Sequence, residues 1–152
     1  MKLKNIIIVF ILACLTQVSY ANCTDTPSIS AGGPQAITAI WQLKEMYVNT
    51  TRVSDSTIAN VNFVLNADLN VAYILKGDQA VQFNLSYIPD TDVKLLNPSN
   101  GAVMFSYKVM TLTDTVLILT AQTPDPQNPN VTHSQEYRFV RANTATQGNS
   151  TQ

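Results

Sequence analysis

The stretch of sequence that decides the fold is Val81–Tyr87, which reads VQFNLSY. Apolar and polar residues alternate along it, so every second side chain lies on the same face of an extended strand. A similar alternation occurs in Val61–Asn66 and in Val103–Val109. We therefore expect strands with one face toward an apolar interior and the other toward water, which is typical of antiparallel sheets.

Eight strands of this kind are predicted along the chain, spaced as in an all-β sandwich or barrel. They are Ile40–Val48, Ala59–Asn66, Leu69–Lys76, Ala80–Tyr87, Asp92–Leu96, Ala102–Met110, Thr115–Ala121 and Glu136–Arg141. Short turns rich in Asn, Asp, Gly and Pro join most of them, so strands that are neighbours in sequence should pair. A short helical turn is expected at Gln35–Ala39. Gln122–Gln135 contains three prolines and is predicted to be one long exposed loop.

The predicted fold class is all-β, an eight-stranded antiparallel up-and-down barrel. Closure is favoured because it removes the two exposed edges that an open sheet would leave. A two-sheet sandwich is the remaining alternative. A barrel of eight strands is wide enough either to be filled by its own side chains or to hold one small ligand. The strand pattern leaves both of these interiors open.

Residues 37–142 resemble small exported lipocalin-like (calycin-type) domains. The resemblance rests on Ile40–Leu43, which reads IWQL and opens the first strand, and on Tyr137–Arg141, which reads YRFVR and closes the last. In lipocalins a Gly-x-Trp motif places an indole at the closed end of the barrel, and an Arg from the last strand packs across it. Here Ala39 stands in place of that Gly.

The resemblance implies that Trp41 and Arg141 close one end of the barrel, with Arg138 as the alternative to Arg141. It also implies a small hydrophobic ligand held in the interior. The aromatic residues of the alternating strands would then form the cavity wall. The candidate wall residues are Phe63, Tyr73, Phe83, Tyr87, Val103, Phe105 and Tyr107.

Segments of different character flank the predicted barrel. Residues 1–21 carry two Lys, then an apolar run, then Ser19-Tyr20-Ala21, and this order predicts a secretory signal peptide. Residues 22–36 are predicted to be a polar leader, and residues 143–152 a disordered tail. The expected location is secreted, either extracellular or periplasmic, with no integral membrane span in the mature form.

A second fate for the N-terminal segment stays open. Ile11–Cys14 reads ILAC and resembles the lipobox of bacterial lipoproteins, which predicts a lipid anchor at Cys14 as the alternative. Cleavage after Ala21 would leave only Cys23, so no intramolecular disulfide could form. Asn-x-Ser/Thr triplets make Asn49, Asn84 and Asn130 candidate glycosylation sites.

Composition and charge exclude some functions. The chain of 152 residues has only 12% charged side chains, and without residues 1–21 it has seven basic against ten acidic groups. The resulting net charge of −3 gives no electrostatic case for binding nucleic acid.

Residues that could carry chemistry are sparse. His133 is the only His and lies in the predicted Pro-rich loop, where no carboxylate or Cys triplet surrounds it. Asp90 and Asp92 sit beside a Pro turn, where a solvated Asp is the ordinary finding. Lys44 and Glu45 are expected on opposite faces of the first strand. We therefore expect no enzyme activity, no cofactor and no metal.

Two functions from different classes follow. The first is a secreted or envelope lipocalin-like barrel that binds a small hydrophobic molecule. The alternative is a non-enzymatic interaction or structural protein with a filled barrel, which acts through its loops at Asn49–Ile58 and Gln122–Gln135. Loops on a rigid scaffold often carry recognition. No particular protein partner can be named from the sequence.

Overall fold

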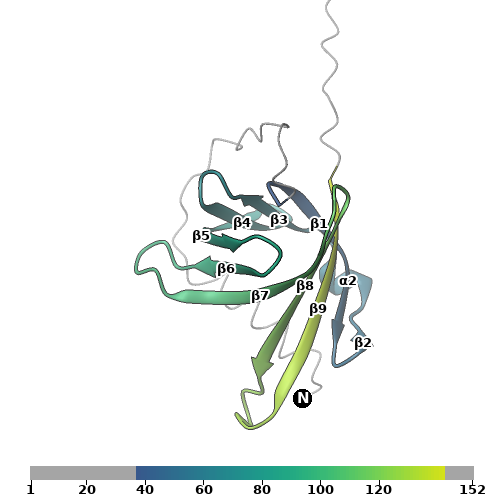
Figure 1. Ribbon diagram of the computed structural model, residues 1–152. Coiled ribbons are helices and arrows are strands. Elements are labelled where there is room, and N and C mark those ends of the chain that lie inside the picture. The colour runs from purple at the N-terminus through teal and green to yellow at the C-terminus, as the bar shows by residue number, and fades with distance from the viewer. Residues whose placement is uncertain (1–36, 143–152) are drawn as a thin grey trace, which may run out of the picture.

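The computed structural model describes residues 37–142, which form a single β-sheet and one short helix (Figure 1). The elements are β1 (Ala39–Val48), β2 (Thr51–Arg52), α2 (Asp55–Ile58), β3 (Val61–Asn66), β4 (Val71–Lys76), β5 (Gln79–Ile88), β6 (Asp92–Leu96), β7 (Val103–Leu112), β8 (Val116–Pro124) and β9 (Thr132–Arg141). The predicted signal peptide, polar leader and tail lie outside the described residues.

The sheet closes on itself. Its strand order is β2-β1-β3-β4-β5-β6-β7-β8-β9, and β1 also pairs with β9. This second pairing runs antiparallel from Trp41 opposite Arg141 to Val48 opposite Gln135. Every other pairing is antiparallel as well. The predicted eight-stranded up-and-down barrel is therefore confirmed, with β2 as a two-residue addition beside the end of β1.

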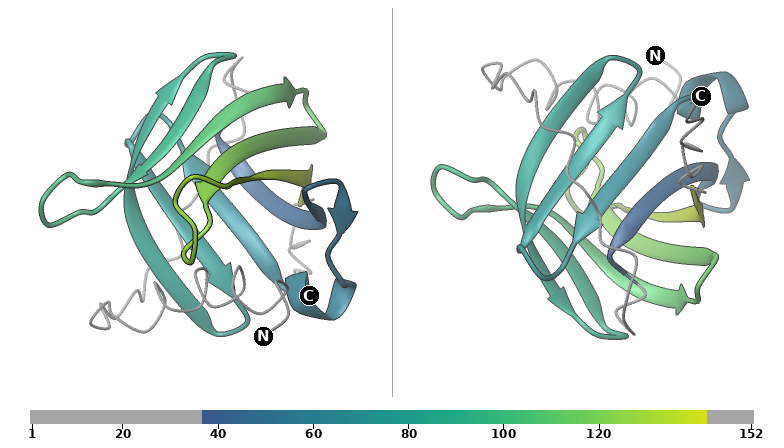
Figure 2. Two further views of the ribbon diagram at one scale, coloured as in Figure 1. Left: turned by 90° about the horizontal axis from the view of Figure 1, so that it is seen from below. Right: turned by 90° about the horizontal axis from the view of Figure 1, so that it is seen from above.

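The up-and-down order places the connections at two ends of the barrel. The Trp41 end holds the start of β1, the end of β9 and the turns after β3, β5 and β7. The loop end holds α2 and the connections at 77–78, 97–102 and 125–131. The hairpin of β8 and β9 extends beyond the other strands, and β4–β7 run across its direction (Figures 1 and 2).

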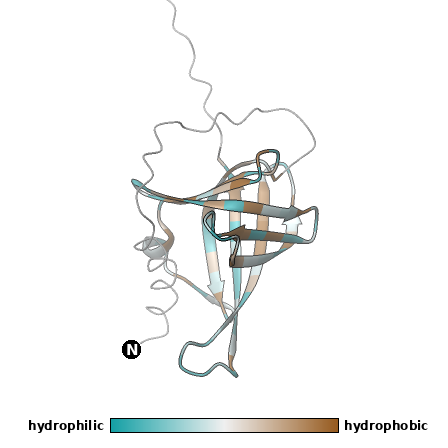
Figure 3. Ribbon diagram, turned by 90° about the vertical axis from the view of Figure 1, so that its left-hand side faces the viewer, coloured by the Kyte–Doolittle hydropathy of each residue, from teal (hydrophilic) through white to brown (hydrophobic). Residues whose placement is uncertain are grey.

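The interior is apolar because alternate residues of each strand point inward. Trp41, Leu65, Leu95, Leu117 and Leu119 are all fully buried in this core. Figure 3 shows hydrophilic and hydrophobic residues alternating along the strands. Asn and Gly at tight turns help each strand to reverse, since Asn70 (φ 52°) and Gly77 (φ 58°) adopt the left-handed conformation that these residues tolerate.

The predicted long loop at Gln122–Gln135 is wrong. β8 continues to Pro124 and β9 begins at Thr132, so only residues 125–131 form the connection. The backbone N–H of Asp125 donates to the carbonyl of Val131 at 2.7 Å and closes it. Pro124 stands at the very end of β8, where a missing N–H donor is tolerated, so it does not end the pairing early.

Two smaller predictions near β1 also change. Ile37 and Thr38 form a turn, and Ala39 already belongs to β1, so the described part of Gln35–Ala39 is not helical. The pairing of β1 with β9 shifts register between Leu43 and Glu45. This bulge leaves both Lys44 and Glu45 outside the core, and the inward row resumes at the buried Met46.

Candidate functional site

Six aromatic rings contact one another inside the barrel. We call them the aromatic cluster: Phe63, Phe83, Phe105, Tyr107, Tyr137 and Phe139. The ring centroids of Phe63 and Phe139 are 4.8 Å apart, and those of Phe63 and Tyr107 are 6.1 Å apart. Phe63 comes from β3, whereas its two partners come from β9 and β7, which do not pair with β3. The rings therefore meet across the interior, not along one wall.

The aromatic cluster fills the middle of the barrel and separates the loop end of the interior from the Trp41 end. Phe63 pairs with Trp41 across β1 and β3, and Val61 follows on the same face toward the loop end. Tyr107 likewise lies between Val109, toward the Trp41 end, and Phe105, toward the loop end. Phe63 and Tyr107 are both buried, so the barrel is filled by side chains at this level.

Trp41 and Arg141 lie together at the end of the barrel that is opposite the loop end. Trp41 is 0% exposed, and its indole Nε1 donates to the carbonyl of Ile37 at 2.9 Å. The guanidinium carbon of Arg141 lies 5.1 Å from the centre of the indole. Arg138, the other candidate, lies 5.0 Å over the ring of Tyr47 on the outer face. The geometry places Arg141, and not Arg138, across Trp41.

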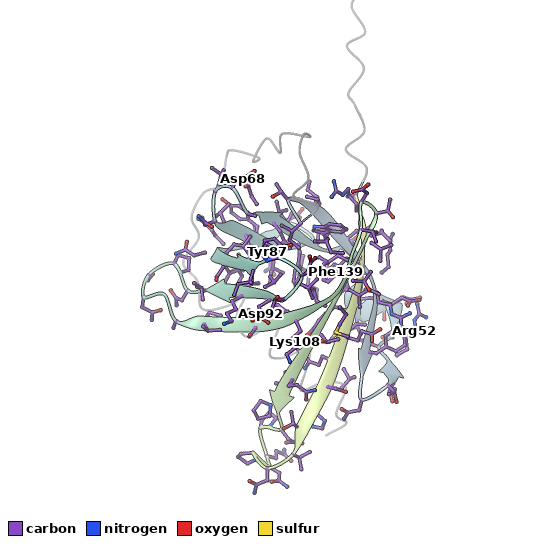
Figure 4. All side chains as sticks on the ribbon, in the orientation of Figure 1. Arg52, Asp68, Tyr87, Asp92, Lys108 and Phe139 are labelled. Carbon is purple, nitrogen blue, oxygen red and sulfur yellow. The ribbon has the colours of Figure 1, made fainter. Side chains whose placement is uncertain are left out.

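Most of the predicted wall residues face the interior. Phe63, Phe83 and Tyr107 are buried, while Tyr87 and Phe105 pack against the core and stay partly exposed. Figure 4 shows Tyr87 and Phe139 within the barrel and Arg52 at its periphery. Partial burial raises the pKa of the Tyr87 phenol, because the charged phenolate would lose solvation there. Their role in binding a ligand stays a prediction.

Two of the predicted wall residues are misplaced. Tyr73 lies between the buried core residues Ala72 and Ile74, so the alternation of β4 puts it on the outer face. Val103 is 57% exposed. The pairing of β6 with β7 shifts register just before it, and this irregularity takes Val103 out of the inward row that contains Phe105 and Tyr107.

The sequence reasoning missed two buried polar residues on β9. His133 is 8% exposed and Gln135 is 7% exposed, and they continue the inward row of Tyr137 and Phe139. The Tyr137 hydroxyl donates to Gln135 Oε1. Burial raises the pKa of Tyr137 well above its usual range, so this phenol stays protonated. The alternation of inward and outward residues continues on the N-terminal side of Tyr137, through Gln135 to His133. It is hard to recognise in the sequence because these inward residues are polar and prolines lie nearby.

Asn49, His133 and Asp125 form a hydrogen-bonded chain at the loop end. Asn49 Oδ1 accepts from the backbone N–H of Ser134 at 2.9 Å, which directs Asn49 Nδ2 to donate to His133 Nδ1 at 2.6 Å. His133 Nε2 then carries the proton and donates to Asp125 Oδ2 at 3.0 Å. This hydrogen bond holds the pKa of Asp125 below its ordinary value of 3.8. The prediction that His133 lies in a loop is wrong, because His133 belongs to β9.

This chain of hydrogen bonds uses both nitrogens of the imidazole. His133 therefore has no free lone pair for a metal or for a substrate proton while the chain is intact. Residues 37–142 contain no group of three or more His, Cys, Asp or Glu side chains that could hold a metal ion. Asp90 has a φ of 54° in the turn between β5 and β6, and Asp92 begins β6.

The three candidate glycosylation sites are all exposed. Asn84 lies on the outer face of β5, Asn130 lies in the 125–131 connection, and Asn49 follows β1. The side-chain nitrogen of Asn49, to which a glycan would attach, already donates to His133. Modification at any of the three stays a prediction.

The closed strand order defines an eight-stranded antiparallel up-and-down barrel, the architecture that lipocalins also have. The sequence matches no family model. No curated protein matches it in sequence. Within residues 37–142 no helix is long and apolar enough to cross a membrane.

Similar solved structures include bovine odorant-binding protein. The structure with its natural ligand is 13% identical, covers 77% of this chain and 78% of that chain, and has a TM-score of 0.46. The complex with undecanal is 14% identical over 77% of this chain and 79% of that chain, with a TM-score of 0.46. A deswapped triple mutant is 13% identical over 70% of this chain and 74% of that chain, with a TM-score of 0.43.

Proposed function

We propose that this barrel binds one small hydrophobic molecule in the loop-end half of its interior. The observation that carries the proposal is the partial exposure of inward-facing residues at the loop-end side of the aromatic cluster and above it. Phe105 and Ala121 both pack against the core yet stay partly exposed. Apolar side chains that line the remaining wall include Val48, Val61 and Val81. Such an apolar lining suits a hydrophobic guest.

The alternative was a filled barrel that acts through its loops. The aromatic cluster does fill the middle of the barrel, but the longest predicted loop is reduced to residues 125–131. That connection is further held by the contact of Asp125 with His133. These observations favour binding inside the barrel over recognition by a mobile loop.

Binding of N-phenylnaphthylamine, an uncharged dye that fluoresces strongly in apolar surroundings, tests the proposal. The full chain is expected to take up one dye per molecule. Ala121→Phe should reduce uptake at least severalfold because its ring would project into the loop-end interior, whereas Gln122→Phe, on the exposed outer face of β8, should not. Absence of saturable uptake by the folded wild type would overturn the proposal.

We also propose that the protein is exported, as residues 1–21 indicate. Mass spectrometry of the protein isolated from its natural source would test this directly. A mature chain that begins at Asn22 would support plain cleavage, and a lipid-modified Cys14 would support the lipid-anchored alternative. A chain that retains Met1–Ala21 would overturn export by either route.

A further inference from the structure

We propose that the guest carries a neutral hydrogen-bond acceptor, which the side-chain amide of Gln135 binds. This inference rests on the proposed function and adds the chemical class of the ligand. Carbonyl, ester and ether oxygens are acceptors of this kind.

Gln135 lies where a guest in the loop-end interior would meet it. It pairs with Val48 of β1 on one side and with Ala121 of β8 on the other. Its side chain shares the inward face of β9 with Tyr137 and Phe139, two members of the aromatic cluster. Gln135 is 7% exposed, so the residue as a whole is buried in the interior.

The amide of Gln135 is only half satisfied by the protein. Its Oε1 accepts the hydrogen bond from the Tyr137 hydroxyl. Within residues 37–142 the structure gives no acceptor for its Nε2, which has two N–H donors. Nε2 is not among the fully buried side-chain atoms that lack a partner, so it can still be reached from the interior. An acceptor atom on the guest would replace water there with a direct hydrogen bond.

The orientation of the amide is set by Tyr137. In the structure Oε1 accepts from the Tyr137 hydroxyl, which leaves Nε2 available to a guest. This arrangement selects an acceptor on the guest in preference to a donor.

The charge of the surroundings argues for a neutral guest. The residues with buried polar or charged side chains among residues 37–142 are Asn66, His133 and Gln135. Arg141, whose Nε is buried, lies over Trp41 at the other end of the barrel, so no cation is buried at the loop end among these residues. Both nitrogens of His133 are already used by Asn49 and Asp125. A carboxylate drawn into this interior would lose its hydration without gaining a cation. A ketone or an ester would not carry that penalty.

Competition against N-phenylnaphthylamine with three compounds of one skeleton tests the inference on the full chain. Ethylnaphthalene has no hydrogen-bond acceptor, acetylnaphthalene has a neutral carbonyl acceptor, and naphthoate has an anionic carboxylate. We expect acetylnaphthalene to displace the dye roughly three- to tenfold better than ethylnaphthalene, the gain typical of one hydrogen bond. Naphthoate should be the weakest of the three.

Gln135→Met removes the amide and keeps a side chain of similar length. In this variant the advantage of acetylnaphthalene over ethylnaphthalene should fall to about one, while ethylnaphthalene still competes. Gln122→Met, the same change on the outer face, should retain the wild-type preference. An unchanged preference in Gln135→Met, or tighter binding of naphthoate than of acetylnaphthalene, would overturn the inference. Failure of the wild type to bind the dye at all would instead overturn the proposed function.

Discussion

His133 Nε2 lies 3.0 Å from Asp125 Oδ2, and this contact joins the start of β9 to the residue that follows β8. The same imidazole accepts from Asn49, which follows β1. One buried ring thus connects two of the segments that surround the loop end. The consequences for stability can be measured separately on its two sides.

The Asp125 side of this contact should make stability depend on pH. Since the pKa of Asp125 is lowered in the folded protein, its ionised form stabilises the fold above the ordinary pKa of 3.8. This contribution is lost as the pH falls from 3.8 through the lower pKa of the folded state. Melting curves should show the largest difference between wild type and Asp125→Asn near neutral pH, and a shrinking one in acid. If the same pH-dependent difference persists in a His133→Gln background, the hydrogen bond is not its cause.

The side chain of Asn49 makes two hydrogen bonds, so its removal should lower the free energy of unfolding. Asn49→Ala removes the acceptor for Ser134 and the donor to His133, and a cost of about 1–2 kcal/mol is expected. Asn49 has a φ of 46°, which Ala tolerates poorly, so Asn49→Gly serves as the control for backbone strain. Urea unfolding of both variants measures the difference. Equal stability of wild type and Asn49→Gly would show that the side-chain contacts contribute nothing.

Trp41→Ala should be among the most damaging single substitutions. It removes a fully buried indole, its hydrogen bond to Ile37 and its contact with Arg141. The expected loss is about 3–5 kcal/mol, a large share of the ~5–15 kcal/mol that stabilises a typical domain. Calorimetry or denaturant unfolding would measure it. A variant that melts like wild type would show that Trp41 does not anchor this end of the barrel.

Phe63 and Tyr73 offer a matched comparison of aromatic residues on opposite faces. Phe63→Ala breaks the contacts with Tyr107 and Phe139 and is expected to cost about 3–5 kcal/mol. Tyr73→Ala acts on the outer face, where a loss of about 1 kcal/mol or less is expected from cross-strand packing. Denaturant unfolding of the two variants tests the assignment of faces. Similar losses for both would contradict it.

The number and order of strands were predictable because they depend on local pattern. Alternation in Val81–Tyr87 predicts both the strand and its inward face, and Phe83 is indeed buried. The same rule failed at Val103 and at Glu45. Each lies at a register shift, where one strand contributes an extra residue opposite its partner and the alternation changes phase. Such shifts depend on how two strands fit together, so neither strand's own sequence reveals them.

By itself, therefore, the sequence determined the strands, most of their inward faces and the up-and-down order, since each of these follows from two-residue periodicity and short turns. Only the tertiary structure decided that Phe63 meets Tyr107 across the interior, that Gln135 is buried beside Tyr137, and that His133 lies between Asn49 and Asp125. The contacts of Phe63 with Tyr107 and of His133 with Asn49 join segments far apart in the chain. They exist because the sheet closes, and closure is a property of all eight strands together.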